Sequence, residues 1–347
     1  MSAAATTVLP PAQPPRTALI TGATGFLGST LAHHLLAEGC TVVGLDDLSN
    51  SSPDALPLGV PLVRGDVRDP EALAEALGRL GKAPEVVFHL AGLIQVGESV
   101  REPARYHSVN AGGTATLVTA ALEAGVEAIV QASSAAVLAS ALGPDDRLDE
   151  TCPIGPESPY GETKRLAEDT LIAAVDTGRL SGASLRLFNL AGSAYGCAEH
   201  HEPETHLIPL ALGAAVGVRP PLQLFGDDFP TPDGTPLRDY VHIEDVVAAF
   251  LAAARRALAR QREGVASYDV FHVGSGVGHS VREVVAMVER VVGRPVPHEI
   301  APRRPGDCAA LVADPTLLGR MLGVRPGADL ERMVRDAAAS HHWLPAE

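Results

Sequence analysis

The chain has 347 residues, of which 46% are hydrophobic and 20% are charged. This apolar content is enough to bury the core of one large α/β domain or two smaller ones, and it excludes a chain that is mainly disordered. Acidic residues outnumber basic residues by 42 to 27, which gives a formal net charge of −15. Because an acidic surface repels phosphate backbones and anionic lipids, we expect neither a nucleic-acid nor a membrane partner.

The cysteines are widely spaced and form no CxxC pair; they are Cys40, Cys152, Cys197 and Cys308. This usage predicts reduced thiols in a cytoplasmic protein. No apolar run approaches the ~18 residues that a membrane span needs. Residues 1–16 contain four prolines and no positive charge before Arg16. We therefore expect a flexible tail there and not a signal peptide.

Continuous apolar segments rich in β-branched residues are typical of strands buried on both faces of a parallel sheet. In chain order they cover residues 17–21, 41–46, 61–64, 85–91, 128–133, 184–189 and 268–273. Amphipathic helical patterns lie between them at 27–38, 71–80, 111–124, 160–174 and 244–259. This alternation predicts a doubly wound parallel sheet of the Rossmann type, with right-handed crossovers.

The pattern changes after about residue 189. Residues 192–203 are polar and rich in glycine, and residues 220–236 contain five prolines. We therefore expect a cofactor-binding domain over residues 17–188 and a smaller, loop-rich domain over 189–347 that binds the substrate. Within the second domain, residues of about 240–272 are expected to pack back on the first.

A glycine-rich turn, TGATGFLG, follows the first strand directly and opens a helix. Gly22 permits the tight turn, Gly25 lets the backbone approach a pyrophosphate, and Gly28 lets the helix pack closely on the strand. The helix N-terminus then offers unpaired N–H groups to the anion. Its position between strand and helix is what makes this motif informative in a chain with 34 glycines.

The next predicted strand ends at Asp46. A carboxylate there accepts hydrogen bonds from ribose hydroxyls and repels a 2′-phosphate, which favours NAD over NADP. Asp66, after the third strand, is similarly placed to accept from an adenine amino group.

A candidate catalytic set lies at the same edge of the sheet. Ser134 follows the fifth strand, and Tyr160 and Lys164 are one helical turn apart at the start of the next long helix. A tyrosine base needs its pKa lowered by roughly 3 units, which an ammonium and a positive nicotinamide ring favour. Only Lys82 and Lys164 are lysines in this arginine-rich chain. A compact ammonium at Lys164 differs chemically from a guanidinium.

These residues and several longer motifs make the chain resemble the extended short-chain dehydrogenase/reductases, and among them the UDP-galactose (UDP-glucose) 4-epimerases. The resemblance runs from residue 17 to about 314. Its most specific motifs are PTPDGTPLRDYVH at 230–242 and RRPGD at 303–307, and it also includes SPYGETK at 158–164, VNAGGT around Asn110 and ETHLIP at 204–209.

The resemblance implies an NAD-dependent 4-epimerase acting on UDP-glucose/UDP-galactose, and on UDP-N-acetyl sugars if space allows, through a 4-keto intermediate. Tyr160 is then the acid/base, Ser134 orients the 4-oxygen, and Lys164 tunes Tyr160 and holds the nicotinamide ribose. The implied cofactor residues are Gly22, Gly25, Phe26, Leu27, Gly28, Asp46, Asp47, Asn50, Ser51, Asp66, Val67, Leu90, Ala91, Gly92, Asn110, Tyr160, Lys164 and Phe188.

The implied substrate residues are Ser134, Tyr160, Asn189, His206, Leu207, Leu224, Phe225, Arg238, Tyr240, Arg304, Asp307 and Leu311. Arginines among them suit a diphosphate clamp. Family members commonly pair through a helical bundle, so the resemblance also implies a homodimer. Leu311 stands where many relatives have tyrosine, and we expect it to leave room beside the sugar 2-substituent.

The chain departs from the family at Ile94, where many relatives have lysine, and at Ala136 and Leu138, where threonine and tyrosine are common. None of these positions removes an essential acid or base. Cys197, His200 and His201 lie close together in sequence, but their spacing fits no known metal site, and we expect no metal.

Other functions share the cofactor site. Nucleotide-sugar dehydratases and UDP-glucuronate decarboxylases place an Asp-Glu pair or a Glu just after the catalytic Ser or Thr, where this chain has Ala135 and Ala136. A UDP-glucuronate 4-epimerase is a further alternative, which would need a cation near the sugar C6. A non-catalytic NAD-binding scaffold is disfavoured because both Tyr160 and Lys164 are present.

Overall fold

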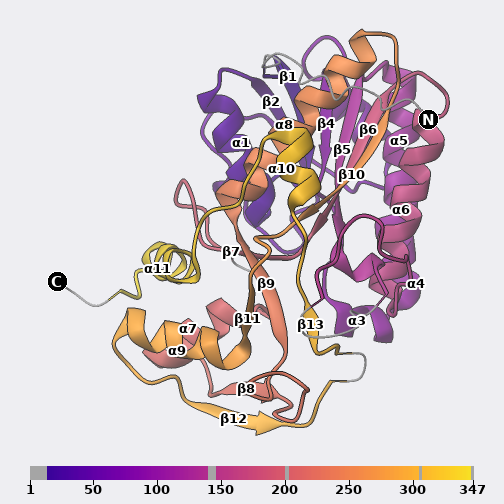
Figure 1. The fold of residues 1–347 in the computed structure, drawn as a ribbon. Coiled ribbons are helices and arrows are strands. Elements are labelled where there is room, and N and C mark those ends of the chain that lie inside the picture. Colours follow the sequence, from indigo (N-terminus) through magenta and orange to yellow (C-terminus); the bar gives the residue numbers. More distant parts are fainter. Residues whose placement is uncertain (1–13, 140–145, 200–202, 305–306, 345–347) are drawn as a thin grey trace.

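The computed structural model describes residues 14–139, 146–199, 203–304 and 307–344, which form two packed parts (Figure 1). The larger part is a seven-stranded sheet in the order β10-β6-β5-β4-β1-β2-β3, with every neighbouring pair parallel. Its strands are β1 (Thr17–Thr21), β2 (Thr41–Asp46), β3 (Leu62–Arg64), β4 (Val86–His89), β5 (Ala128–Ser134), β6 (Ser181–Leu187) and β10 (Tyr268–Val273). The predicted doubly wound parallel sheet is confirmed.

Helices cover both faces of this sheet. One face carries α1 (Phe26–Ala37), α8 (Ile243–Arg262) and α10 (Thr316–Leu322), and the other carries α2 (Pro70–Gly78), α5 (Gly113–Ala124) and α6 (Pro159–Val175). Two short helices, α3 (Val96–Arg101) and α4 (Pro103–Tyr106), and a π-helical turn (His107–Gly112) lead into α5. Short 3₁₀ turns cover Pro53–Ala55 and Ala135–Val137.

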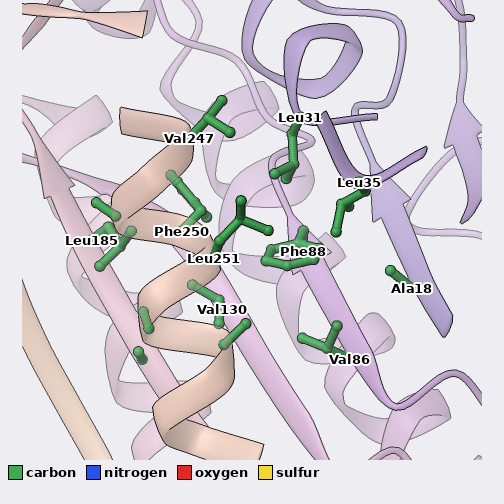
Figure 2. Close-up of a cluster of buried hydrophobic side chains, with 14 of the residues drawn as sticks. Ala18, Leu31, Leu35, Val86, Phe88, Val130, Leu185, Val247, Phe250 and Leu251 are labelled. Atoms are coloured by element: carbon green, nitrogen blue, oxygen red, sulfur yellow. The ribbon is translucent and has the colours of Figure 1, made fainter. Parts of the chain in front are cut away.

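Alternate residues along each strand supply the two cores, as the two-residue period of a strand requires. In Figure 2, Phe88 of β4 lies near Phe250 of α8, with 6.4 Å between ring centroids. Leu31 and Leu35 of α1 complete this cluster, and all four side chains are fully buried. Burial of an aromatic or leucine side chain contributes about 1.5–3 kcal/mol. The helix α8 therefore belongs to the core of the larger part, although it follows most of the sheet's strands by more than 50 residues in the sequence.

The smaller part contains a four-stranded sheet, a two-stranded sheet and three helices. Strand β9 (Leu237–His242) pairs with β7 (Asn189–Ala191), β11 (Gly278–Ser280) and β13 (Ala310–Leu311), and β8 (Leu222–Phe225) pairs with β12 (His298–Ala301). The helices α7 (Leu207–Val216), α9 (Val281–Val292) and α11 (Leu330–Ser340) form one apolar cluster of their own. The smaller part therefore has sheets and helices of its own between its loops.

Two predicted strands differ from the observed strands by two or more residues at an end. The strand predicted at 85–91 is β4, which begins at Val86 and ends at His89. The strand predicted at 184–189 begins earlier, at Ser181, and ends at Leu187. Phe188 donates its backbone N–H to the Val273 carbonyl, and Asn189 already belongs to the second sheet. The chain therefore passes from one part to the other at Phe188.

Candidate active site

The glycine-rich turn has the geometry that a dinucleotide needs. Gly22 has φ +69° and leaves no room for a Cβ, which would lie 2.7 Å from the Ala91 nitrogen. A Cβ on Gly28 would lie 2.1 Å from the Gly22 oxygen. Gly25 is different, because its Cβ would meet only one protein atom, at 3.5 Å. The protein itself does not require glycine there, so the open space suits a ligand that approaches the backbone.

The N-terminus of α1 is also free to receive an anion. Gly25 caps the helix without any side-chain hydrogen bond, and no acidic residue lies in the first turn. The first N–H groups of a helix carry partial positive charge and lack intrahelical partners. The observed turn therefore fits a pyrophosphate.

Asp46 ends β2 next to this turn and is 9% exposed. Its Oδ2 accepts from the Thr24 N–H at 3.0 Å, and its Oδ1 accepts from the Leu48 N–H at 2.9 Å. The Ser51 hydroxyl also approaches Oδ1, at 3.4 Å, and Asp47 accepts from the Ser49 N–H. A carboxylate has about four acceptor positions, so Asp46 can still accept from a ribose hydroxyl while it holds the loop in place.

Asp66 is engaged more fully than sequence reasoning indicated. The Arg68 guanidinium donates to both of its oxygens, at 2.9 and 2.6 Å, and the Arg68 N–H adds a third bond. The hydrogen bonds from Arg68 lower the pKa of Asp66 despite partial burial. An adenine contact at Asp66 remains a prediction, and the planar Arg68 beside it is a feature that the sequence analysis missed.

Asn110 fixes the segment after β4. Its Oδ1 accepts from the Leu93 N–H at 2.8 Å, and its Nδ2 donates to the Leu93 carbonyl at 3.0 Å and to the Thr163 hydroxyl at 3.1 Å. A Cβ on Gly92 would lie 3.0 Å from Asn110 Oδ1 and 3.5 Å from Lys164 Nζ. The predicted cofactor residues Leu90–Gly92 therefore lie against the predicted catalytic lysine.

Ser134, Tyr160 and Lys164 meet at the carboxyl ends of the central strands. Ser134 is the last residue of β5, and its hydroxyl accepts from the Ala136 N–H at 3.1 Å. Tyr160 and Lys164 are buried in the first two turns of α6, which Ser158 caps by accepting from the Gly161 N–H. The ammonium of Lys164 lies 6.0 Å from the centroid of the Tyr160 ring and donates to the Ala132 carbonyl at 2.9 Å.

Burial opposes the charged forms of both residues. It raises the pKa of the Tyr160 phenol, and a hydrogen bond from Ser134 partly offsets this effect. Burial also lowers the pKa of Lys164 to about 8, although the negative charge of Glu168 acts to raise it. The sequence analysis considered the neighbouring cation and not burial. Tyr160 therefore needs positive charge from a bound ligand, in addition to Lys164, to act as a base near neutral pH.

Tyr106 is a buried neighbour of Tyr160 that sequence reasoning missed. The two rings meet edge to face, with centroids 6.5 Å apart. The Tyr106 hydroxyl accepts from the Gln95 N–H at 3.0 Å and lies 2.8 Å from Glu98 Oε2. It therefore ties the segment after Ile94 to the wall of the site.

Asn189, His206, Leu207 and Tyr240 line one pocket with Phe26 at the start of α1. Asn189 and Tyr240 are directly paired between β7 and β9. His206 caps α7, and its Nδ1 donates to Glu204 Oε1 at 2.8 Å. Burial disfavours the imidazolium, but the hydrogen bond with Glu204 and the charges of Glu199 and Glu204 together outweigh burial and raise the pKa of His206. One pocket therefore joins the cofactor turn to the predicted substrate residues.

The remaining predicted substrate residues form a second cluster at the ends of β8, β9 and β13. The Arg304 guanidinium stacks on the Phe225 ring, 3.8 Å from its centroid. Arg238 donates to Asp307 at 3.3 Å and to the Cys308 carbonyl at 3.0 Å. The structure thus brings together two arginines, an aromatic face and a carboxylate. These groups suit the phosphates, base and ribose of a nucleotide.

Leu311 pairs with Arg238 in the sheet and packs beside Phe188 and Ala135. It therefore lies between the nucleotide cluster and the segment that follows Ser134. Leu224 is buried at the end of β8 next to Phe225, and Val67 is buried against Gly113. Cys197 is buried beside Phe26 and Ile243, and its two histidine neighbours lie outside the described residues.

Comparison with known proteins agrees with this geometry. Residues 18–273 match the model of the NAD dependent epimerase/dehydratase family. The chain belongs to this family. It is 39% identical to the UDP-glucose 4-epimerase of Streptomyces lividans over 331 residues. This match covers 94% of this chain and 96% of that protein. The match extends beyond the Rossmann sheet into the smaller part.

Solved structures of family members superpose over nearly the whole chain. The Brucella ovis UDP-glucose 4-epimerase in complex with NAD has a TM-score of 0.86 and 36% identity, with 95% of this chain and 99% of that chain covered. The Bifidobacterium longum UDP-glucose 4-epimerase in complex with NAD⁺ and UDP has a TM-score of 0.84 and 31% identity, with 94% and 98% covered. Among the described helices of this chain, none is both long and apolar enough to cross a membrane.

Proposed function

We propose that this chain is an NAD-dependent 4-epimerase of UDP-hexoses, with UDP-glucose and UDP-galactose as its main pair. The observation that carries the proposal is the set formed by half-buried Ser134 and buried Tyr160 and Lys164, in a chain where one pocket joins Phe26 of the glycine-rich turn to Asn189, His206 and Tyr240. The similarity to named UDP-glucose 4-epimerases over both parts of the chain supports the same substrate class. Residues 17–188 then provide the cofactor site, and most of 189–347 provides the substrate site.

In this reaction Tyr160 removes the proton from the sugar 4-hydroxyl and later returns it. Ser134 holds the same oxygen, and Lys164 stabilises the phenolate and reaches the ribose beside Gly92. Bound NAD supplies the hydride acceptor and donor at C4. Arg238, Arg304, Phe225 and Asp307 anchor the nucleotide, so the 4-keto sugar can turn over between the two hydride transfers.

The cofactor assignment rests on Gly22, Gly25, Gly28 and Asp46. Their geometry supports a dinucleotide with a free ribose 2′-hydroxyl, because a 2′-phosphate would lie against the Asp46 carboxylate. Nucleotide released from the purified protein by heat should be NAD. Release of NADP would contradict the proposal.

The reaction is tested by incubating the protein separately with UDP-galactose, UDP-glucuronate and UDP-N-acetylglucosamine and separating the products by chromatography. We expect UDP-glucose from the first substrate, and Tyr160→Phe should lower this rate by about 10²–10⁴-fold. Tyr195→Phe changes a half-exposed tyrosine outside the set and is the matched control. A 4-keto-6-deoxy sugar would indicate a dehydratase, a pentose a decarboxylase, and exclusive turnover of UDP-glucuronate the alternative epimerase. No turnover at all would favour the scaffold.

We also propose that the protein is a cytoplasmic homodimer. All four cysteines are free thiols, as a reducing compartment favours. Neighbouring helices α3 and α6 expose Val100 and Leu166, and α5 exposes the small residue Ala115 beside them. A dimer would bury these apolar side chains. Light scattering of the wild type should give twice the chain mass of 36.0 kDa. The Leu166→Asp variant should give the mass of a single chain.

A further inference from the structure

One buried carboxylate links β5 and α6, which carry the candidate catalytic groups, to β6. Glu168 lies one helical turn after Lys164 on α6, and its side chain is 1% exposed. Its Oε1 accepts from the Ser133 hydroxyl at 2.6 Å and from Arg186 Nε at 2.9 Å. Its Oε2 accepts from Arg186 Nη2 at 2.8 Å and from Arg165 at 3.3 Å.

Each partner of Glu168 adjoins a residue of the proposed site. Ser133 directly precedes Ser134 at the end of β5, and Arg186 lies two residues before Phe188 on β6, where the chain passes to the second sheet. Glu168 itself is on the same helical face as Lys164. The bidentate pairing with Arg186 fixes direction as well as distance.

The surroundings of Glu168 hold this arrangement firmly. Arg186 is 3% exposed, and its Nη1 donates to His272 Nε2 at 3.5 Å. His272 Nδ1 donates to the Leu148 carbonyl at 2.9 Å, which leaves Nε2 as an acceptor. Burial opposes ionisation of Glu168, but the hydrogen bond and charge of Arg186 outweigh it and lower the pKa of that carboxyl. Glu168 is therefore a carboxylate at neutral pH.

We propose that Glu168 is a positioning residue for the epimerisation, whose carboxylate sets the relative placement of Ser134, Tyr160 and Lys164 and keeps Lys164 charged. This inference rests on the proposed function. Glu168 touches none of the reacting groups and acts through Lys164 and Ser133. A buried ammonium without a nearby negative charge loses its proton more readily, and Glu168 provides that charge.

Other charged or titratable groups also face this region. They are Tyr160 and Arg165 on α6, His89 on β4, Arg186 on β6, Tyr268 and His272 on β10, and Asp149 and Glu150 beyond them. None of these described groups favours the ammonium of Lys164 as the charge of Glu168 does. Replacing Glu168 with a neutral residue should therefore change the pH range in which Lys164 is charged.

The first test compares Glu168→Gln with the wild type in the NAD-loaded, full-length enzyme. We follow the pH profile of kcat between about pH 6 and 10. The fall of kcat on its alkaline side, the alkaline limb, should move to lower pH by about one unit. At the pH optimum, kcat should fall about tenfold with little change in KM, because the nucleotide cluster is untouched. Glu168→Asp keeps the charge and should leave the limb near its wild-type position.

Two further variants separate this role from a merely structural one. Ser133→Ala removes one hydrogen bond to Glu168 and leaves its charge, so the limb should not move. Glu168→Gln combined with Arg186→Met removes both members of the ion pair and avoids an unpaired buried guanidinium. This double variant should fold, retain NAD and still show the shifted limb. An unmoved limb in both Gln variants, or an equal shift in Ser133→Ala, would overturn the inference.

A measurement without substrate keeps this test distinct from that of the reaction. The difference absorbance of tyrosinate, taken against the matching Tyr160→Phe variant, follows ionisation of Tyr160 alone. The enzyme is kept loaded with NAD, whose positive ring favours ionisation of Tyr160 at a pH where Lys164 is still charged. In Glu168→Gln this ionisation should move to higher pH, because Lys164 is charged over a narrower range. If the wild type failed to epimerise UDP-sugars, the proposed function would fail while the tyrosinate shift would still decide the role of Glu168.

Discussion

His89 links protonation to stability directly beneath the cofactor site. It ends β4 and is buried between two threonines, with Nδ1 2.8 Å from the Thr21 hydroxyl and Nε2 2.9 Å from the Thr114 hydroxyl. The Thr114 hydroxyl donates to the Asn110 carbonyl at 2.6 Å, so it accepts from Nε2. The neutral ring therefore has both nitrogens satisfied, and it holds β1 just before the glycine-rich turn.

Burial and the charge of Lys164 lower the pKa of His89 to about 3. In the unfolded chain a histidine has a pKa of about 6.5, so the unfolded state binds the proton more tightly. The stabilisation is complete above about pH 6.5 and is lost as the pH falls toward 3. At pH 5 the unfolded histidine is mostly charged, which costs about 2 kcal/mol of unfolding free energy relative to pH 7.5.

The perturbation is His89→Gln, which keeps a polar group facing Thr114. At pH 7.5 the variant should be less stable by about 1 kcal/mol, because one hydrogen bond is lost. Between pH 7.5 and 5 its unfolding free energy should fall by about 2 kcal/mol less than that of the wild type. Urea denaturation followed by circular dichroism at both pH values measures the difference, with the exposed His298→Gln as control. An identical fall in His89→Gln and wild type would refute the reasoning.

The remaining predictions concern the site. Asp46→Ala should weaken NAD binding about tenfold or more in calorimetry, since a ribose acceptor and a loop anchor are lost together; unchanged affinity would remove Asp46 from the cofactor site. Lys164→Arg should lower kcat severely, because a guanidinium is larger than the ammonium seated between Gly92 and the Ala132 carbonyl; near-normal turnover would contradict its role. Arg238→Ala and Arg304→Ala should each weaken UDP binding by about 1.5–3 kcal/mol, and normal UDP affinity in both would exclude a nucleotide sugar. Leu311→Tyr should depress turnover of UDP-N-acetylglucosamine more than that of UDP-galactose, by ~1–3 kcal/mol in the ratio of kcat/KM, and an equal effect on both would show that Leu311 does not limit the site.

The parts of the fold that sequence patterns predicted are those with local signals. The seven strands of the main sheet were found because buried parallel strands are continuous apolar runs. The glycine-rich turn was found because its chemistry follows from position between strand and helix. The helix α7 was not predicted, since it is apolar all round its short length and shows no helical period. The helix α9 was not predicted either, although its apolar residues recur at helical spacing, because glycines precede it and prolines follow it. Which neighbours cover these helices depends on contacts between distant segments.

The candidate site divides in the same way. Tyr160 and Lys164 were predicted from spacing, whereas Glu168 resembled an ordinary charged helix residue. A signal was present, because positions 160, 164 and 168 lie on one helical face and a carboxylate there shares the environment of the other two. What the sequence could not provide was Arg186 from β6, which makes burial of Glu168 tolerable. Contacts between distant segments decide whether such a charge is buried.

The balance of charges gives a reason for the deep placement of Tyr160, the proposed catalytic tyrosine. Burial alone favours a neutral phenol at Tyr160 and a neutral amine at Lys164, and both effects oppose base catalysis. Glu168 reverses part of the effect on Lys164, and Ser134 reverses part of the effect on Tyr160. Because water is excluded, each of these interactions is stronger than it would be at the surface. Burial therefore makes the proton of Tyr160 responsive to any positive charge bound beside it.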